Sequence, residues 1–131
     1  MRSHTTRIRV RYGETDQMGV VYHANYLVYF EIGRTEYLRA LGPSYAGLED
    51  AGIRLAVVDA RCRFRAGARY DDELDVETCV EGSSGARVTF RYEIRKPDGT
   101  PVADGTTTLG CIDESGRPRR LPRELAELLQ G

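Results

Sequence analysis

The chain has 131 residues, of which 40% are hydrophobic and 30% charged, and its 19 Lys and Arg nearly balance its 20 Asp and Glu. This composition is that of an ordinary globular protein and not of a disordered chain. The length predicts a single domain over residues 1–131. A net charge of −1 argues against a protein that binds nucleic acid through bulk electrostatics.

The sequence lacks the features of exported and membrane-spanning chains. Its longest apolar runs are a few residues, such as 55–58, whereas a membrane span needs about 20. The first seven residues lack the apolar segment of a signal peptide. Cys62, Cys79 and Cys111 are odd in number and far apart, which disfavours a disulfide framework or a zinc site. We therefore expect a cytoplasmic protein with no membrane span and no metal.

The first predicted element is a strand over residues 7–12, where Ile8, Val10 and Tyr12 alternate with arginines. A loop over residues 13–19 follows, because the alternation breaks at two glycines and several polar residues.

The period then changes to that of a helix over residues 24–41, which Gly42-Pro43 ends. Gly33 inside this helix costs about 1 kcal/mol relative to alanine, so it predicts the close approach of another backbone. Oppositely charged pairs are expected at Glu31–Arg34 and Glu36–Arg39. Two stripes run along the helix: Leu27, Phe30, Arg34, Leu38 and Leu41, and beside them Tyr26, Phe30, Gly33 and Tyr37.

The rest of the chain reads mostly as strands. A short helix or turn is expected over residues 44–52 and a short terminal helix over 121–130. The arginine rows are expected to meet Asp75, Glu77 and Glu93 across neighbouring strands as a solvated ladder, with a basic ligand-binding face as the alternative. The strands are predicted over residues 53–66, 73–80, 87–95 and 101–113.

One long helix and a set of hairpin-connected strands define an α+β fold, in which an antiparallel sheet is covered on one face. Such a sheet leaves two edges open. We therefore expect the chain to pair with another copy, which would cover an edge or a face.

The chemistry of the chain is concentrated before the long helix. Asp16 lies in a glycine-containing loop, and the helix begins a few residues later. A helix start presents free N–H groups, which can hold a carbonyl oxygen as charge develops on it, while a carboxylate attacks or activates water. The alternative is that Asp16 only closes the loop through nearby backbone N–H groups, and that His23 is a loop residue.

The residues from Tyr12 to Tyr26 include Asp16, Gly19, two valines, Tyr22 and His23 in a row. This run resembles the signature of the hotdog-fold acyl-CoA thioesterases, within the 4-hydroxybenzoyl-CoA thioesterase family and its YbgC-like branch. The similarity continues through residues 30–36 and resumes at 66–78 and 116–122.

The resemblance implies a curved antiparallel five-stranded sheet wrapped around one long helix, with two chains forming one continuous sheet in a homodimer or homotetramer. It also implies hydrolysis of an acyl-CoA thioester to the free acid and coenzyme A. In that reaction Asp16 would be the nucleophile or general base, and the backbone N–H of His23 would polarise the carbonyl. No cofactor is implied, since coenzyme A enters as part of the substrate.

The resemblance further assigns the binding residues. Gly19, Tyr22 and Tyr26 would surround the acyl group, and Val57, Val58 and Asp59 would reach it from the partner chain. The hairpin that brings several basic residues to the coenzyme A phosphates in the aromatic-thioester members holds one arginine here, Arg87. The phosphates would be bound by Arg87, Arg95 or Lys96, or by the cluster of Arg117, Arg119 and Arg120, for which a solvated tail is the alternative. Two alternatives stay open: a non-catalytic acyl-thioester binding module, and a hotdog hydratase or dehydratase.

Overall fold

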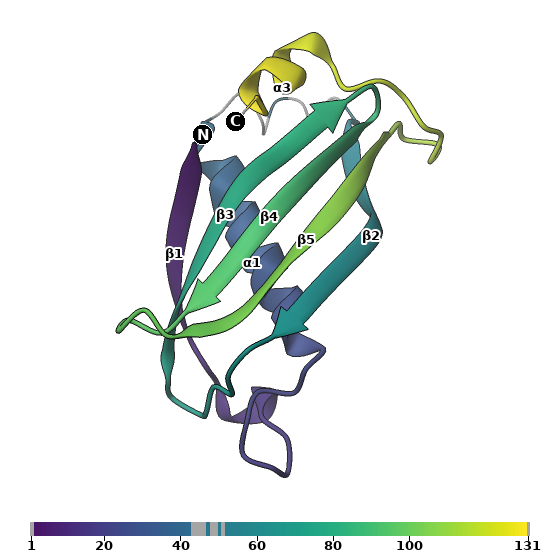
Figure 1. The fold of residues 1–131 in the computed structure, drawn as a ribbon. Helices are drawn as coiled ribbons and strands as arrows, with labels where there is room; N and C mark the ends of the chain where they lie inside the picture. Colours follow the sequence, from purple (N-terminus) through teal and green to yellow (C-terminus); the bar gives the residue numbers. More distant parts are fainter. Residues whose placement is uncertain (1, 43–46, 48–49, 51, 131) are drawn as a thin grey trace.

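The computed structural model describes residues 2–42, 47, 50 and 52–130, and within them five strands form one antiparallel sheet in the order β1-β3-β4-β5-β2. The sheet is curved, and α1 lies along one face of it (Figure 1). This is the α+β hotdog arrangement that the sequence predicts. The elements are β1 (Ser3–Arg9), the 3-10 helix η1 (Tyr12–Glu14), α1 (Asn25–Arg39), β2 (Arg54–Phe64), β3 (Glu73–Ser84), β4 (Arg87–Arg95), β5 (Pro101–Ile112) and α3 (Arg123–Leu128).

The core fills the space between α1 and the covered face of the sheet. Alternate residues of β3 and β4 point into it, as their period-two pattern predicts. The ring of Phe30 in α1 stacks on Tyr92 of β4, with ring centroids 4.4 Å apart. The side of α1 that faces the sheet consists of Tyr26, Tyr29, Phe30, Gly33, Tyr37 and Leu38.

The strand predicted over residues 7–12 was wrong in its bounds, since β1 spans Ser3–Arg9. Two residues of the predicted periodic patterns, Leu27 and Tyr12, are exposed. Leu27 is 42% exposed, because the larger aromatic rings of the neighbouring stripe face the sheet and turn Leu27 outward. Tyr12 is 77% exposed, because the chain leaves the sheet after Val10 and the Glu14 carboxylate accepts the Arg11 N–H, which closes the 3-10 helix η1.

The ion pairs of α1 also differ in part from the prediction. Glu36 pairs with Arg39 as expected. Arg34 instead turns toward the sheet and donates a hydrogen bond of 3.3 Å to the Tyr92 hydroxyl. The element expected over residues 44–52 lies largely outside the described residues.

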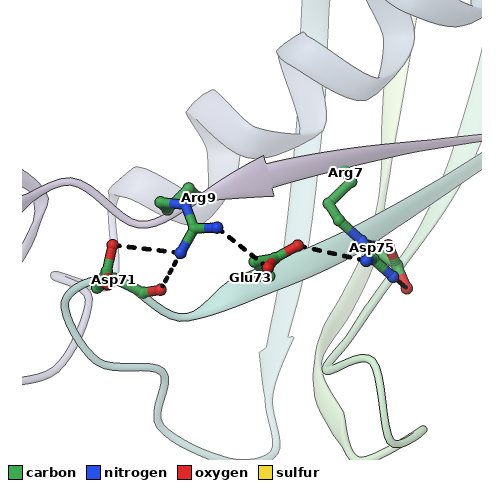
Figure 2. Close-up of polar contacts among 5 residues, drawn as sticks. All are labelled: Arg7, Arg9, Asp71, Glu73 and Asp75. Atoms are coloured by element: carbon green, nitrogen blue, oxygen red, sulfur yellow. Dashed lines mark hydrogen bonds and ion pairs between the residues drawn. The ribbon is translucent and has the colours of Figure 1, made fainter.

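A ladder of ion pairs covers the other face of the sheet, as predicted. Arg7 of β1 donates to Asp75 at 2.9 Å, and Arg9 donates to Glu73 at 3.0 Å (Figure 2). Arg95 of β4 pairs with Glu77 of β3 at 2.6 Å. These acidic partners neutralise much of the arginine charge on this face, which favours the solvated ladder over a basic ligand-binding face.

The two edges of the sheet are β1 and β2. β2 pairs with β5 along one side and carries an irregularity between Val57 and Asp59. No helix in the described part of the chain is long and apolar enough to cross a membrane.

Candidate active site

The Asp16 loop (residues 14–23) connects η1 to α1 as a short hairpin. The N–H of Asp16 donates to the Val20 carbonyl at 2.9 Å, and Thr15 and Val21 form an isolated bridge. The N–H of Gly19 donates back to the Asp16 carbonyl at 2.9 Å, and Gly19 has a φ of 81°. A non-glycine side chain is strained at that φ, so the sequence places glycine where the turn requires it.

The Asp16 carboxylate is held in place by its own loop. Its Oδ1 accepts a hydrogen bond of 2.9 Å from the Met18 N–H. Within the described residues, no hydrogen bond reaches its Oδ2, and the residue is half-buried. The loop-closing role that the sequence suggested is therefore present, and one carboxylate oxygen remains free.

The start of α1 leaves backbone donors free. Ala24 precedes the helix with helical backbone angles and gives it no side-chain cap. The N–H groups of Asn25 and Tyr26 already donate to the carbonyls of Tyr22 and His23. In the described part of the chain, no group accepts from the N–H of His23 or Ala24. Free amides at the positive end of the helix dipole favour negative charge.

An open pocket of about 280 Å³ brings the Asp16 loop, the start of α1 and the end of β2 together. Asp16 and His23, which the sequence singled out in one short run, both line it, and so does Tyr26. The full lining is Asp16, Met18, Val20, Val21, His23, Tyr26, Phe64, Arg65, Ala66 and Gly67.

Aromatic rings form one wall of this pocket. Tyr26 is 4% exposed, and its ring centroid lies 5.7 Å from that of Phe64 and 5.8 Å from that of Tyr29. Burial raises the pKa of Tyr26, which keeps its hydroxyl neutral. The ring of His23 meets Phe64 edge-on at 6.2 Å. Sequence reasoning missed Phe64. The only feature of the sequence that could have indicated Phe64 as a pocket residue is its position at the end of a predicted strand that is otherwise rich in arginine.

The other predicted binding residues lie outside this pocket in a single chain. Gly19 forms the turn of the Asp16 loop, and the half-exposed Tyr22 packs its ring on His23 at 4.5 Å. Val57 and Val58 are about half exposed on β2, and Asp59 pairs with Arg61.

Arg87 is exposed at the beginning of β4. β4 runs from the end of the sheet that carries α3 toward the opposite end (Figure 1). Phe64, which lines the Asp16 pocket, pairs with Ala103 of β5, and Ala103 pairs with Ile94 near that opposite end of β4. Arg87 and Asp16 therefore do not share a pocket within one chain.

Asp16 and His23 line the same pocket, and a carboxylate near a helix start with free backbone amides suits reactions at a carbonyl group. The carboxylate can attack the carbonyl carbon or take a proton from water, and the amides can accept the negative charge that develops on the oxygen. A curved antiparallel sheet around one helix is a hotdog fold, and a carboxylate in a pocket at the start of that helix suits a thioesterase.

Comparison with known proteins gives the family. Residues 10–129 match the thioesterase-like superfamily, and the chain belongs to it. The Bacillus subtilis protein YneP is 40% identical over 85% of this chain and 81% of its own length. The acyl-CoA thioester hydrolase YbgC of Escherichia coli is 32% identical over 90% of this chain and 89% of its own.

A solved structure agrees in fold over nearly the whole chain. The DHNA-CoA thioesterase of Staphylococcus aureus superimposes with a TM-score of 0.91 at 39% identity, covering 98% of this chain and 89% of that one. The protein is therefore an enzyme of the thioester hydrolase class.

Proposed function

We propose that the protein hydrolyses an acyl-CoA thioester to the free acid and coenzyme A at the pocket between Asp16 and His23. Family membership and the named activities of its relatives support this substrate class. The single observation that carries the proposal is that one pocket is lined both by Asp16, which has a free carboxylate oxygen, and by His23, whose N–H has no acceptor among the described residues.

The His23 N–H donates to the thioester oxygen and stabilises the negative charge that forms there during attack. Asp16 acts in one of two ways. As a general base it takes a proton from water, whose oxygen then attacks the carbonyl carbon. As a nucleophile it attacks that carbon itself and forms an anhydride, which water hydrolyses. In both routes the carbon–sulfur bond breaks and the thiolate of coenzyme A leaves with its electron pair and is then protonated.

A thioester is already activated toward attack, so the reaction requires no cofactor, and coenzyme A enters as part of the substrate. Gly19, Tyr22 and Tyr26 lie at or beside the pocket and would surround the acyl end of the substrate. Arg87 would bind the phosphates of coenzyme A from a second chain, since it lies far from Asp16 within its own.

The working unit is a homodimer or homotetramer. The outer edge of β2 has no partner strand among the described residues, and Val57 and Val58 are 51% and 53% exposed on it. Antiparallel pairing of two β2 strands would carry Val57, Val58 and Asp59 of one chain toward the Phe64 end of the other. The pocket, open in one chain, would gain a second wall. Sizing the protein in solution tests this arrangement, and a monomer at working concentration would contradict it.

The activity test follows thiol release from a panel of aromatic, short-chain and long-chain acyl-CoAs. Wild-type turnover together with a loss of at least a hundredfold in kcat for Asp16→Asn supports the proposal. Asp98→Asn is a matched control, because Asp98 also accepts a hydrogen bond from the backbone N–H two residues later and does not line the Asp16 pocket. Equal turnover by wild type and Asp16→Asn would remove Asp16 from the mechanism.

The same panel separates the two alternatives. Saturable binding of acyl-CoA without thiol release, equal in wild type and Asp16→Asn, would indicate a binding module. A change in the acyl chain with the thioester intact would indicate a hydratase or dehydratase.

A further inference from the structure

Glu14 connects the Asp16 loop to α1 through both its backbone and its side chain. Its carbonyl accepts two hydrogen bonds of 2.9 Å, one from the Tyr22 N–H and one from the Asn25 side-chain amide. Tyr22 directly precedes His23, and Asn25 is the first residue of α1. The backbone of Glu14 therefore closes the open end of the hairpin that carries Asp16 and joins it to the helix start.

The carboxylate of Glu14 makes the second connection. Its Oε1 accepts a hydrogen bond of 2.8 Å from the Arg11 N–H and one of 3.0 Å from the hydroxyl of Tyr29. Only 15% of the Glu14 side chain is exposed, and Tyr29 is 1% exposed. Burial and the hydrogen bond to Glu14 raise the pKa of Tyr29, so the hydroxyl keeps its proton and remains a donor.

These contacts fix the two reacting groups relative to each other. Glu14 lies two residues before Asp16, and its carbonyl holds the residue before His23. Tyr29 lies one turn into α1, so its hydrogen bond to Glu14 fixes the position of the helix relative to the loop. A displacement of about 1 Å between reacting groups can cost a hundredfold in rate.

We infer that Glu14 and Tyr29 are positioning residues of the thioesterase reaction, which set the distance between the Asp16 carboxylate and the His23 N–H. Neither touches the substrate. The hydrolysis steps proposed above use only Asp16 and the His23 N–H and give no role to Glu14 or Tyr29. The fold brings these two residues into contact although they lie 15 positions apart in the sequence. The inference rests on the proposed function of the pocket, and the experiment below separates the two.

The first variant is Tyr29→Phe, which removes the hydroxyl and keeps the ring in the core. We expect kcat to fall at least tenfold while KM changes less than threefold, because the groups that bind substrate are untouched and those that react are displaced. The matched control is Tyr37→Phe. Tyr37 lies on the same helix, is also 1% exposed, and its hydroxyl has no hydrogen-bond partner in the described residues. Tyr37→Phe is expected to keep wild-type kcat.

The second set of variants changes the acceptor. Glu14→Gln keeps a side-chain oxygen for Arg11 and Tyr29 and is expected to retain most of the kcat, whereas Glu14→Ala loses at least as much as Tyr29→Phe. Because the two residues act through one contact, Glu14→Ala/Tyr29→Phe is expected to be no slower than Glu14→Ala alone. Additive losses, or equal losses in Glu14→Gln and Glu14→Ala, would overturn the inference.

Amide hydrogen exchange of residues 14–23 gives a readout that does not depend on activity. Tyr29→Phe is expected to speed exchange at the Asp16 and Tyr22 amides at least tenfold, and Tyr37→Phe to leave it unchanged. Wild-type hydrolysis that depends on Asp16, together with unchanged kcat in Tyr29→Phe, overturns the inference and leaves the proposed function standing. Absent wild-type hydrolysis overturns the proposed function, and unchanged exchange in Tyr29→Phe would then overturn the positioning of the loop as well.

Discussion

Gly33 of α1 lies so close to Thr78 of β3 that a Cβ at position 33 would sit 2.6 Å from the Thr78 Oγ1 and 2.7 Å from a methyl carbon of Val76. The helix therefore rests directly on the middle of the sheet at this glycine. The sequence predicted that another backbone approaches Gly33. That prediction was wrong in its partner, because side chains of β3 make the close approach.

The first prediction concerns Gly33→Ala. Alanine improves helix propensity by about 1 kcal/mol, but the added methyl group overpacks the contact at a cost of about 1–3 kcal/mol. We expect a net loss of about 1 kcal/mol in the free energy of unfolding, measured by urea denaturation. Gly82→Ala is the control, because a Cβ there meets nothing within 4 Å. A Gly33→Ala protein more stable than wild type would show that α1 can move away from β3.

The second prediction concerns the ion-pair ladder and pH. Hydrogen bonds from Arg7 and Arg95 hold the pKa values of Asp75 and Glu77 below their ordinary 3.8 and 4.5. A carboxylate with a lowered folded-state pKa stabilises the fold above its unfolded pKa, and this contribution is lost as the pH falls through the folded-state value.

Arg95→Gln removes the partner of Glu77 and is expected to cost at most about 1 kcal/mol at pH 7, since the pair is partly exposed. The difference in the free energy of unfolding between Arg95→Gln and wild type becomes smaller as the pH falls from 5 to 3. Urea denaturation across that pH range measures this difference. Arg63→Gln is the control, because Arg63 is exposed and forms no ion pair with the described residues. A difference between Arg95→Gln and wild type that stays constant down to pH 3 would contradict the assignment.

The third prediction concerns Phe64, which forms part of the pocket wall although it is 55% exposed. Phe64→Ala removes apolar contact with the acyl group, so KM is expected to rise about tenfold with little change in kcat. Thermal stability changes little, because the side chain is mostly outside the core. Tyr70→Ala is the control, since Tyr70 is 57% exposed and lies outside the pocket. A similar KM in both variants would remove Phe64 from the binding site.

The fourth prediction concerns the thiol of Cys62 on β2. Burial raises its pKa from 9.0 to about 11, so its thiolate fraction at pH 8 is about a hundredfold lower than that of a free thiol. Reaction with a chromogenic disulfide is expected to be slow in the native protein and fast in urea. Subtracting the rate of Cys62→Ser isolates this thiol from Cys79 and Cys111. A Cys62 that reacts as fast in the native protein as in urea would contradict the raised pKa.

The sequence predicted the sheet well because β3 and β4 have one buried and one solvated face. Their inward residues, such as Val76 and Phe90, follow a strict period of two. The helix was harder, because two stripes of apolar residues run side by side along it. Only the position of the sheet decides which stripe is buried: Leu27 of one stripe is exposed, and Tyr29, which belongs to neither predicted stripe, is in the core.

The sequence predicted those site residues that lie close together along the chain and missed those that come from distant elements. Asp16 and His23 belong to one loop, so a short run of residues identified both. Phe64 reaches their pocket from the end of β2, and Tyr29 reaches Glu14 from within α1. Neither contact leaves a periodic or motif signal, because each depends on how distant parts of the chain pack.

The two outer strands of the sheet differ in character. Arg7 and Arg9 are more than half exposed on β1 and are held there by acidic partners, whereas β2 presents Val57 and Val58. Charged edge strands resist the addition of a further strand, and apolar ones accept it. Pairing through β2 alone would end at two chains, because the charges of β1 disfavour a further strand on the opposite edge. The proposed association through β2 would therefore leave each sheet with outer edges that resist further growth.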